Sequence, residues 1–291
     1  IGLSLAQAWI DQGQPAAITL AELGPGRGTL MADALRATKA VPGFHAALSV
    51  HFVEASPVLR NAQAKAVPDA SWHTSVETLP DAPLFLVANE FFDALPIRQF
   101  VRDGDGWREK MIGVSDGKLS FGLSAAAPIA LLEHRLADTK DGNLIEHCPA
   151  LPAIIQTISE KISVHGGAAL IIDYGDWVSQ GDTLQALRAQ KHADPFDDPG
   201  NVDLTAHVDF AAIAENAKPA KFSRLTTQGV FLERLGITQR AQTLAQGLSG
   251  DALNSHISAH RRLTHPAEMG DLFKVISIYP VTANPPPGLE T

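Results

Sequence analysis

Short apolar runs alternate with amphipathic stretches along most of this chain, and this alternation determines its predicted architecture. Each apolar run ends in a polar or glycine-rich turn, and the stretch that follows repeats its apolar residues at helical spacing. The pattern predicts parallel strands joined by helices in a doubly wound α/β sheet. The predicted strands cover residues 18–23, 48–53, 71–74, 84–88, 168–172, 221–226 and 272–278.

Helices are predicted over most of the intervening stretches. The first begins at the start of the chain (IGLSLAQAWIDQG), and another follows Pro57. The remaining predicted helices cover residues 29–39, 129–137, 151–165, 208–216, 240–247 and 252–261.

The pattern changes after the strand at 84–88. The runs 97–101 and 107–114 are separated by Asp103-Gly104-Asp105-Gly106, which is typical of a β-hairpin with a glycine-containing loop. Residues 118–123 are consistent with a third antiparallel strand. This segment therefore predicts a small antiparallel unit inserted into the parallel sheet.

We predict the following division of the chain. Residues 1–96 and 166–282 form the core, and residues 97–165 form an inserted β-hairpin and helical subdomain. The polar residues 181–201 are expected to pass over the ligand-binding edge, and the proline-rich tail 283–291 is expected to be loose.

Composition and charge narrow the classes of partner. The chain has 23 basic and 32 acidic residues, a formal net charge of −9 and a pI near 5.6. Nucleic-acid affinity rests on Lys and Arg neutralising phosphates, so this balance argues against a nucleic-acid partner. A single cysteine, Cys148, excludes an intrachain disulfide framework and suits a reducing compartment. No apolar run approaches the ~20 residues of a membrane span, so we expect no membrane insertion.

The stretch Ile18–Gly28 (ITLAELGPGRG) places a glycine-rich turn between a buried strand and a helix. Glycine permits positive φ and lets a ligand approach the backbone closely, so this turn is a candidate nucleotide site. Glu22 lies two residues before the first glycine, at the carboxyl end of the strand. A fixed negative charge there disfavours phosphate and favours a cationic or hydroxyl-rich ligand.

The spacing of the glycines separates two classes of ligand. A dinucleotide fingerprint requires G-x-G-x-x-G, whereas Gly24, Gly26 and Gly28 place the third glycine one position early. The pattern is instead E-x-G-x-G-x-G, and Glu54 at the end of the second strand can accept hydrogen bonds from both ribose hydroxyls of an adenosine group. This combination predicts S-adenosylmethionine as the cofactor. A glycine-rich turn without a ligand is the weaker alternative.

The candidate cofactor-binding residues lie at the carboxyl ends of the predicted strands. Arg27 in the glycine loop would lie close to the ligand and offset the acidic residues, and Ser75 follows the third strand at the adenine edge. The full set is Glu22, Gly24, Gly26, Arg27, Gly28, Glu54, Ser75 and Asn89.

The segment Asn89–Pro96 (NEFFDALP) follows the fourth strand and faces the expected position of the reacting methyl group. It resembles the Asn/Asp-Pro-Pro-aromatic loop of nitrogen-methylating enzymes, with Glu90 and Phe91 in place of the two prolines. Glu90 and Asp93 could hold a guanidinium by charge-assisted bidentate hydrogen bonds. The alternative is structural: Phe91 and Phe92 lie in the core, Asp93 caps a turn and Glu90 is solvated.

Two further polar segments are weaker candidates. Asp203–Asp209 (DLTAHVD) precedes a helix, and His207 is the histidine that we would test as a proton acceptor. Capping of that helix by Asp203 or Thr205 is an equal alternative. Asp173 ends the fifth strand beside the site and could serve only to satisfy the backbone. The candidate catalytic residues are therefore Asn89, Glu90, Asp93 and His207.

A metal site is not predicted. The sequence Glu146-His147-Cys148 contains ligand-type residues, but three adjacent residues cannot easily face one ion. No second pair of residues has the spacing of a zinc site.

Six segments together resemble the MidA-like proteins: ELGPGRGTL, VEASPVLRNAQ, VANEFFDALPIRQF, LIIDYG, DLTAHVDF and MGDLFKV, in chain order. These are S-adenosylmethionine-dependent methyltransferases, and they include the mitochondrial complex I assembly factor, a protein arginine methyltransferase. The resemblance covers roughly residues 2–278. It implies a class I (Rossmann-like) methyltransferase fold with an insertion after the fourth strand. It also implies an arginine on a respiratory-complex subunit as the acceptor in the mitochondrial branch.

The chain departs from that family at its start. Family members carry an N-terminal region, with a Gly-Asp-Phe and a Ser/Thr-x-x-Glu type segment, that helps to cover the cofactor and is absent here. The chain begins without Met and inside a helical pattern, with Ile1, Leu5 and Trp9 on one face. We therefore expect the natural protein to start further upstream. The resemblance implies a cytoplasmic location for bacterial members and the mitochondrial matrix for the eukaryotic branch.

These observations together predict methyl transfer from S-adenosylmethionine to a nitrogen, with arginine in a partner protein as the acceptor. One alternative is a non-catalytic assembly or binding protein that keeps the methyltransferase fold. Another is a methyltransferase that acts on a small molecule. A nicotinamide-dependent dehydrogenase ranks below both because of the glycine register.

Overall fold

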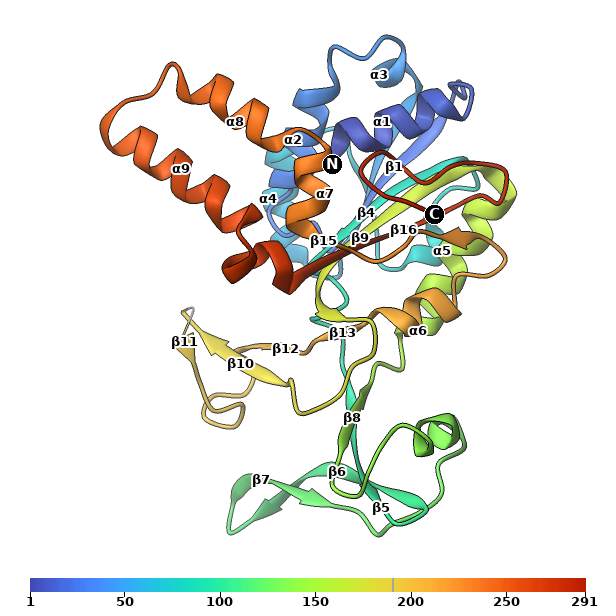
Figure 1. The fold of residues 1–291 in the computed structure, drawn as a ribbon, viewed down its shortest axis with the longest axis vertical. Coiled ribbons are helices and arrows are strands. Elements are labelled where there is room, and N and C mark those ends of the chain that lie inside the picture. Colours follow the sequence, from blue (N-terminus) through green and yellow to red (C-terminus); the bar gives the residue numbers. More distant parts are fainter. Residues whose placement is uncertain (190) are drawn as a thin grey trace.

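The computed structural model describes residues 1–189 and 191–291, and Figure 1 shows a helix-covered sheet with two smaller β units below it. The central sheet has the strand order β14-β16-β9-β4-β1-β2-β3. The strands from β1 to β4 and β9 pair in parallel, whereas β16 runs antiparallel to β9. The predicted doubly wound, mostly parallel sheet is therefore confirmed. Its main strands are β1 (Ile18–Leu23), β2 (Leu48–Val53), β3 (Ser71–His73), β4 (Leu84–Asn89), β9 (Gly167–Asp176), β14 (Lys221–Phe222) and β16 (Phe273–Tyr279).

Strand β1 is central because the chain moves outward from it in two directions. Strands β2 and β3 follow on one side, and β4 and β9 follow on the other. Every residue of β1 is buried, as expected for a strand covered by helices on both faces. Leu23 pairs with both Val53 of β2 and Ala88 of β4, so the residues after these strands emerge side by side. Ligands of such sheets bind at this carboxyl edge.

Helices cover both faces of the sheet (Figure 1). One face carries α1 (Gly2–Asp11), α2 (Thr29–Thr38), α3 (Phe44–Ala47) and α7 (Gln228–Arg234), and α4 (Pro57–Ala66) lies beside α2. The other face carries α5 (Leu151–His165), α6 (Phe210–Glu215) and the short helix η1 (Val76–Thr78). Each face has its own apolar cluster, represented by Trp9, Met31 and Phe44 on the first and by Ile155, Ile158 and Phe210 on the second. Full burial of such a side chain contributes about 1.5–3 kcal/mol.

The insert after β4 is a separate antiparallel sheet with the order β7-β6-β5-β8. The predicted hairpin and third strand are confirmed as β5 (Arg98–Asp103), β6 (Gly106–Ser115) and β7 (Lys118–Leu123). Strand β8 (Leu144–His147) was not predicted. The predicted helix at 129–137 is a 3-10 helix, η2 (Ala130–Leu136). A small core of Phe100, Trp107, Leu132 and Ile145 holds this sheet together.

The segment 97–165 was predicted to belong to the insert as a whole, but in the structure it has two parts. Residues 98–147 contain the strands of the antiparallel sheet and η2. Helix α5 instead buries Ile155, Ile158 and Ile162 in the same apolar cluster as the strands of the central sheet. We therefore place the boundary between insert and core just before α5.

The polar segment 181–201 forms part of the second β unit. Strands β10 (Gln185–Arg188) and β11 (Lys191–His192) pair with each other, and β10 also pairs with β12 (Asp203–Thr205). After two connecting residues, β13 (Val208–Asp209) returns the chain to β9. The expectation that Asp203 or Thr205 caps the next helix was wrong, because both lie in β12. Asp209 is the cap of α6, and its Oδ1 accepts a hydrogen bond from Ala212 N–H at 3.1 Å.

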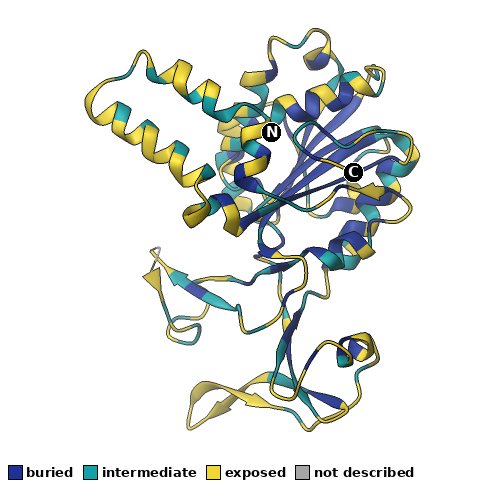
Figure 2. Ribbon diagram, in the orientation of Figure 1, coloured by how far each residue is buried: buried dark blue, intermediate teal, exposed yellow. Residues whose placement is uncertain are grey.

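The C-terminal part contains the two helices predicted at 240–247 and 252–261, but its strand at 221–226 differs from the prediction, and α7 and the short helix before β16 were not predicted. The strand predicted at 221–226 is broken into β14 and β15 (Thr226–Thr227), which pair with different parts of β16. Helices α8 (Ile237–Ala245) and α9 (Gly250–Thr264) form a hairpin that projects from the core, and neither has a buried residue (Figures 1 and 2). The short η3 (Pro266–Gly270) then leads into β16.

The tail 283–291 is packed against the core, in contrast to the expected loose end. Ser4 Oγ of α1 donates a hydrogen bond to Pro287 O at 2.8 Å, and Arg224 N–H donates one to Glu290 O at 2.9 Å. Leu289 is only 8% exposed because it joins the apolar cluster beside α7. A buried leucine and backbone hydrogen bonds therefore outweigh the loop-like composition of this segment.

The cap of α6 provides a test of the fold. Replacing Asp209 by Ala removes the acceptor for Ala212 N–H and for Ser179 N–H, so Asp209→Ala should lower the free energy of unfolding by about 1 kcal/mol. The measurement is urea denaturation followed by circular dichroism. The matched control is Asp203→Ala, an exposed acid in β12, which should change stability little. Equal effects of the two substitutions would contradict the assignment of Asp209 as the cap.

Candidate active site

The glycine loop bends away from β1 through left-handed backbone conformations. Gly24 has φ +57° and Gly28, the N-cap of α2, has φ +79°. A Cβ at Gly24 would lie 2.9 Å from the ring of Phe91, which comes from the loop after β4. Gly24 N–H donates to Val53 O of β2 at 3.0 Å. The loop therefore needs glycine at Gly24 for two reasons, its φ and the close contact with Phe91.

Glu22 lies beneath this loop and is almost completely buried, with 3% of its surface exposed. Desolvation raises the pKa of Glu22 to about 7, and a hydrogen bond with the backbone of Met31 opposes the rise. Met31 lies in the first turn of α2, whose N-cap has no side chain, so the acid interacts favourably with the N-terminus of that helix. Its Oε2 has no partner among the described residues. Glu22 thus has a structural role and one oxygen left for a ligand.

Glu54 follows β2 and is held in place by its own neighbours. Its Oε1 accepts a hydrogen bond from Ser56 N–H at 2.7 Å, and its Oε2 accepts one from Gln63 Nε2 at 3.1 Å. The guanidinium of Arg60 donates to the Glu54 backbone carbonyl and to His73 O. These contacts fix the carboxylate at the carboxyl edge of the sheet.

Gln63 of α4 connects Glu54 to the glycine loop and was not singled out in the sequence. Its side chain is 0% exposed, and Nε2 also donates to Gly26 O at 2.8 Å. Its Oε1 accepts a hydrogen bond from Trp72 Nε1 at 2.8 Å. Both N–H donors of this buried amide and one of the two lone pairs on its oxygen are therefore used in hydrogen bonds. Gln63 thus holds Glu54 and the glycine loop at a fixed distance from each other. The sequence signal for this role is weak: Gln63 is a polar residue on the side of α4 that faces the core.

Arg27 and Ser75 lie on the outer side of this arrangement. Arg27 is exposed in the glycine loop, and Ser75 is half-buried at the N-cap of η1. The N–H of Glu54 donates to His73 O, which places the end of β3 beside Glu54. The structure therefore brings the predicted residues of the first three strands to one edge.

The loop after β4 is anchored by Asp173 of β9. The N–H groups of Phe91, Phe92 and Asp93 all donate to Asp173 Oδ2, at 3.2, 3.0 and 3.2 Å. Tyr174 N–H donates to Oδ1 at 3.0 Å. Asp173 is completely buried, and desolvation and the charge of Asp93 raise its pKa to about 8. The structural interpretation of Asp173 is therefore correct: it satisfies backbone groups, and Oδ2 can accept these bonds in either protonation state.

Glu90 begins this loop in a strained conformation. It has φ +50°, which is uncommon for a residue with a Cβ, and its N–H donates to Ile172 O at 3.0 Å. Its side chain is exposed, and Asn89 Nδ2 donates to Glu90 Oε1 at 3.4 Å. Strain of this kind persists only where the surroundings enforce it, and it concentrates at functional sites.

Asp93 is buried although its side chain is acidic. It is 5% exposed, and its Oδ1 has no partner in the described part of the chain. Desolvation raises the pKa of Asp93, the nearby Glu90 raises it further, and a hydrogen bond with Tyr174 opposes the change. Phe92 is 3% exposed and belongs to the core, as the structural interpretation expected. Asp93 therefore combines deep burial with an oxygen that no described residue contacts as a hydrogen-bond partner.

His207 lies beside Tyr174 but lines a different cavity from Asp93. Its ring meets that of Tyr174 edge to face, with centroids 5.4 Å apart. It lines a cavity of about 60 Å³ together with Glu146, His147 and Cys148. Desolvation lowers the pKa of His207, and Glu146 opposes the change. His207 thus lies close to Tyr174, and it does not share a cavity with Asp93.

Residues 1–189 and 191–291 contain no group of three or more His, Cys, Asp or Glu side chains arranged to hold a metal ion. None of their helices combines the length and apolar character that crossing a membrane requires.

The chain was compared with known families. A family model described as S-adenosyl-L-methionine-dependent methyltransferase matches residues 1–228. The chain belongs to this family. The match contains β1, the glycine loop, Glu54 and the loop after β4, so it includes the carboxyl edge described above.

Named relatives support the same assignment. The chain is 33% identical over 311 residues to "Protein arginine methyltransferase NDUFAF7, mitochondrial" of Xenopus laevis, covering 96% of this chain and 71% of the relative. Identity to the protein of the same name in Homo sapiens is 31% over 314 residues, covering 96% and 70%.

Solved structures agree in fold. A superfamily member from Burkholderia thailandensis, bound to S-adenosyl-homocysteine, superposes with a TM-score of 0.80 at 28% identity and covers 99% of this chain and 77% of its own. A native structure from the same organism gives a TM-score of 0.78 at 30% identity, covering 96% and 77%. The Rossmann-like methyltransferase fold and S-adenosylmethionine as the cofactor are thereby confirmed.

The residues at the carboxyl edge fit this cofactor. In the glycine loop Gly24 is exposed and Gly26 is half-buried, and Glu54 presents a fixed carboxylate of the kind that accepts hydrogen bonds from ribose hydroxyls. Glu22 has an oxygen without a partner in the described part of the chain. Two acids suit a ligand that carries hydroxyl groups and positive charge.

The anchor at Asp173 can be tested directly. Asp173→Asn replaces one carboxylate oxygen by an NH₂ group, which cannot accept hydrogen bonds. The four backbone N–H groups then have a single oxygen to share, or some of them face the NH₂ group. The free energy of unfolding should therefore fall by about 1–3 kcal/mol. Amide hydrogen exchange at Phe91, Phe92 and Asp93 should become faster. The control is Asp176→Asn, since Asp176 accepts a hydrogen bond only from Trp177 N–H at the exposed end of β9. Unchanged exchange at residues 91–93 would show that the loop does not depend on Asp173.

Proposed function

We propose that the protein transfers a methyl group from S-adenosylmethionine to an arginine nitrogen of a partner protein. The observation that carries this proposal is Asp93, a carboxyl group 5% exposed whose Oδ1 has no partner among the described residues. It lies in the loop after β4, and Phe91 of the same loop lies on Gly24. Such a group is complementary to a guanidinium. The names of the relatives, which are protein arginine methyltransferases, support the same acceptor. A respiratory-complex subunit is the partner that we propose to test first.

The cofactor side would be formed by the first three strands. When bound, S-adenosylmethionine supplies a methyl group on a sulfonium centre. Glu54 would bind the ribose hydroxyls, and Ser75 would lie at the adenine edge. The loop from Gly24 through Gly26 and Arg27 to Gly28 would surround the methionine part together with Glu22. Gln63 would keep Glu54 and the loop at a constant separation.

The acceptor side would be formed by the loop after β4. Asp93 and Glu90 would orient one guanidinium nitrogen toward the methyl group, with Asn89 between the two halves of the site. Catalysis would then come mainly from positioning and from complementary charge. Asp93 would also accept the proton that the nitrogen loses. His207 would act beside Tyr174, whose side chain lowers the pKa of Asp93 and so lies near both residues.

Two other functions are distinguished by one measurement. The protein is incubated with a lysate and a tritiated methyl donor, and the label is separated by mass. Label on proteins supports the proposal, label in the low-mass fraction supports a small-molecule acceptor, and cofactor binding without label supports a non-catalytic assembly protein. Mass spectrometry of the labelled proteins then identifies the modified residue.

The role of Glu54 predicts a loss of cofactor binding in Glu54→Ala. Each hydrogen bond from a hydroxyl to a carboxylate contributes about 1.5–3 kcal/mol, so two lost bonds should weaken affinity at least about 100-fold. Isothermal titration calorimetry with S-adenosylmethionine measures the change. Glu77→Ala, at an exposed acid in η1, serves as the control and should bind normally. Unchanged affinity in Glu54→Ala would remove this residue from the ribose site.

The role of Asp93 predicts a defect in turnover and not in cofactor binding. Asp93→Asn should keep its affinity for S-adenosylmethionine and lower kcat by about 10²-fold or more. Because burial raises the pKa of Asp93, the ionised fraction grows as pH increases through that pKa. The turnover of the wild-type protein should therefore rise with pH, and the variant should lose this rise. A wild-type rate, or an unchanged pH profile, would contradict the proposed role.

A further inference from the structure

The β6–β7 hairpin has one apolar face that is exposed. In its register Ile112 lies opposite Phe121, and Val114 lies opposite Leu119. Ile112 is 62% exposed and Val114 is 72% exposed, and every residue of β7 is exposed (Figure 2). Contiguous apolar surface of this kind marks interaction sites on folded proteins.

The opposite face of the same hairpin has a different character. There Met111 lies opposite Gly122, and Gly113 lies opposite Ser120. Side chains of a strand alternate between the two faces, so the apolar pairs are concentrated on one side. The two apolar pairs therefore make this face the candidate interaction surface of the hairpin.

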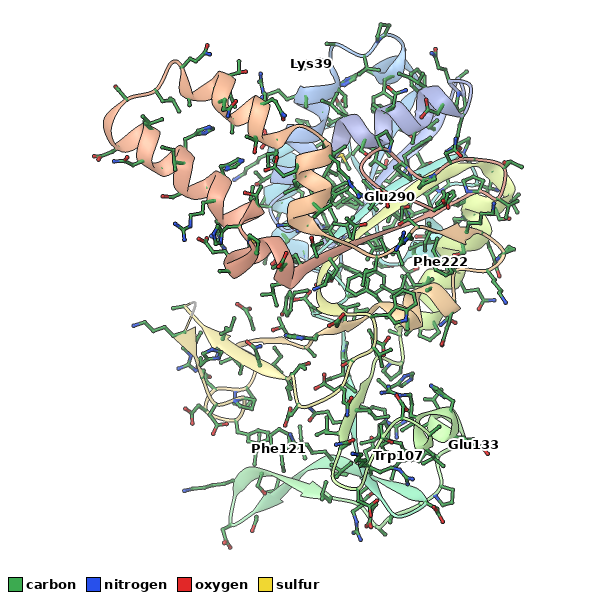
Figure 3. The ribbon with its side chains drawn as sticks, viewed as in Figure 1. Lys39, Trp107, Phe121, Glu133, Phe222 and Glu290 are labelled. Atoms are coloured by element: carbon green, nitrogen blue, oxygen red, sulfur yellow. The ribbon has the colours of Figure 1, made fainter. Side chains whose placement is uncertain are left out.

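The apolar face continues into a cavity of about 310 Å³. Ile112 and Phe121 form one wall, and Leu184 and Leu204 of the second β unit form the other. The ring of Phe121 also contacts Phe196, with centroids 4.6 Å apart, so the two β units approach each other here (Figure 3). The floor is the loop from Asp93 to Ile97. The cavity therefore joins the exposed hairpin to the acceptor loop.

The charges around this cavity favour a cation. The lysine on its wall, Lys110, is paired with Asp182 at 2.6 Å and lies over the Phe121 ring at 4.1 Å. Gln99 Nε2 also donates to Asp182, so that acid is already occupied. Asp93 at the inner end has Oδ1 without a partner among the described residues. Apolar walls that lead to a buried acid are complementary to a positive group on an apolar stem, such as the side chain of arginine.

We propose that the β6–β7 face and this cavity together bind an extended segment of the protein substrate. Apolar side chains of that segment would lie on the Ile112–Phe121 and Val114–Leu119 pairs, and its basic side chain would enter the cavity toward Asp93. The period of two residues in an extended chain matches the spacing of these pairs along β6. This inference rests on the proposed function, because it names how the acceptor reaches the same site. Continuity with the cavity favours a substrate segment over a second copy of this chain.

The experiment uses a defined probe. It is a fluorescein-labelled synthetic peptide with one central arginine flanked on both sides by alternating isoleucine and serine. Fluorescence anisotropy in the presence of S-adenosylhomocysteine measures its binding. The test variant combines Ile112→Asp and Phe121→Asp, and the matched control is Met111→Asp on the opposite face. We expect the double variant to weaken binding at least about tenfold, and the control to bind as the wild type does.

Three companion measurements make the result decisive. Calorimetry with S-adenosylhomocysteine must give wild-type affinity for the double variant, and Phe121→Ala replaces that variant if its fold is impaired. A peptide with serine in place of every isoleucine should bind at least about tenfold more weakly. Equal binding by both peptides, or by wild type and variant, would overturn the docking inference. A dimer formed through this face would also overturn the docking inference. Light scattering would detect such a dimer in the wild type and its loss in the double variant.

The docking inference and the proposed function can fail separately. Mass spectrometry of the peptide after incubation with S-adenosylmethionine reports methyl transfer independently of anisotropy. Specific binding without transfer would uphold the docking surface and count against arginine methylation. Transfer that is equally fast in wild type and double variant would uphold the proposed function and overturn the docking surface.

Discussion

Three backbone N–H groups meet at one oxygen of Asp173, and the loop after β4, which is the proposed acceptor half of the site, depends on this interaction. Their convergence fixes the direction of the chain from Phe91 to Asp93. It therefore holds Phe91 against Gly24 and directs Asp93 toward the cavity. The strained φ of Glu90 is tolerated because the next residues cannot relax without losing these bonds. Placing an acid in the core is costly, and four backbone donors offset that cost.

The cofactor half has an independent support. Gln63 ties Glu54 to the glycine loop, and the two halves meet where Phe91 lies on Gly24. A scaffold in which each half has its own anchor can keep the cofactor geometry constant while the acceptor surface varies. The two β units of this chain lie on the proposed acceptor side, where members of one methyltransferase family can differ without disturbing the common chemistry.

The sequence predicted the parts of the fold that follow from strong local patterns. The runs at β1, β2 and β4 are apolar and end in polar residues, so both the sheet and its ligand-binding edge could be located. Short edge strands such as β8 and β12 carry no such pattern, because tertiary pairing and not local preference creates them. Strand pairing also decided which residue caps α6. Asp203, Thr205 and Asp209 all have side chains that can cap a helix, but Asp203 and Thr205 pair in β12, so Asp209 lies at the helix start. The part played by Gln63 depends on contacts far apart in the chain, which spacing alone does not reveal.

Trp72 gives the network around Gln63 an optical consequence. Its indole N–H is hydrogen-bonded to the amide that also holds Glu54 and the glycine loop. Indole emission is sensitive to the polarity and rigidity of its surroundings, so a ligand that changes the contacts of Glu54 would also change the surroundings of Trp72. If Glu54 binds the ribose as proposed, the chain contains an intrinsic spectroscopic reporter of cofactor binding that needs no attached label.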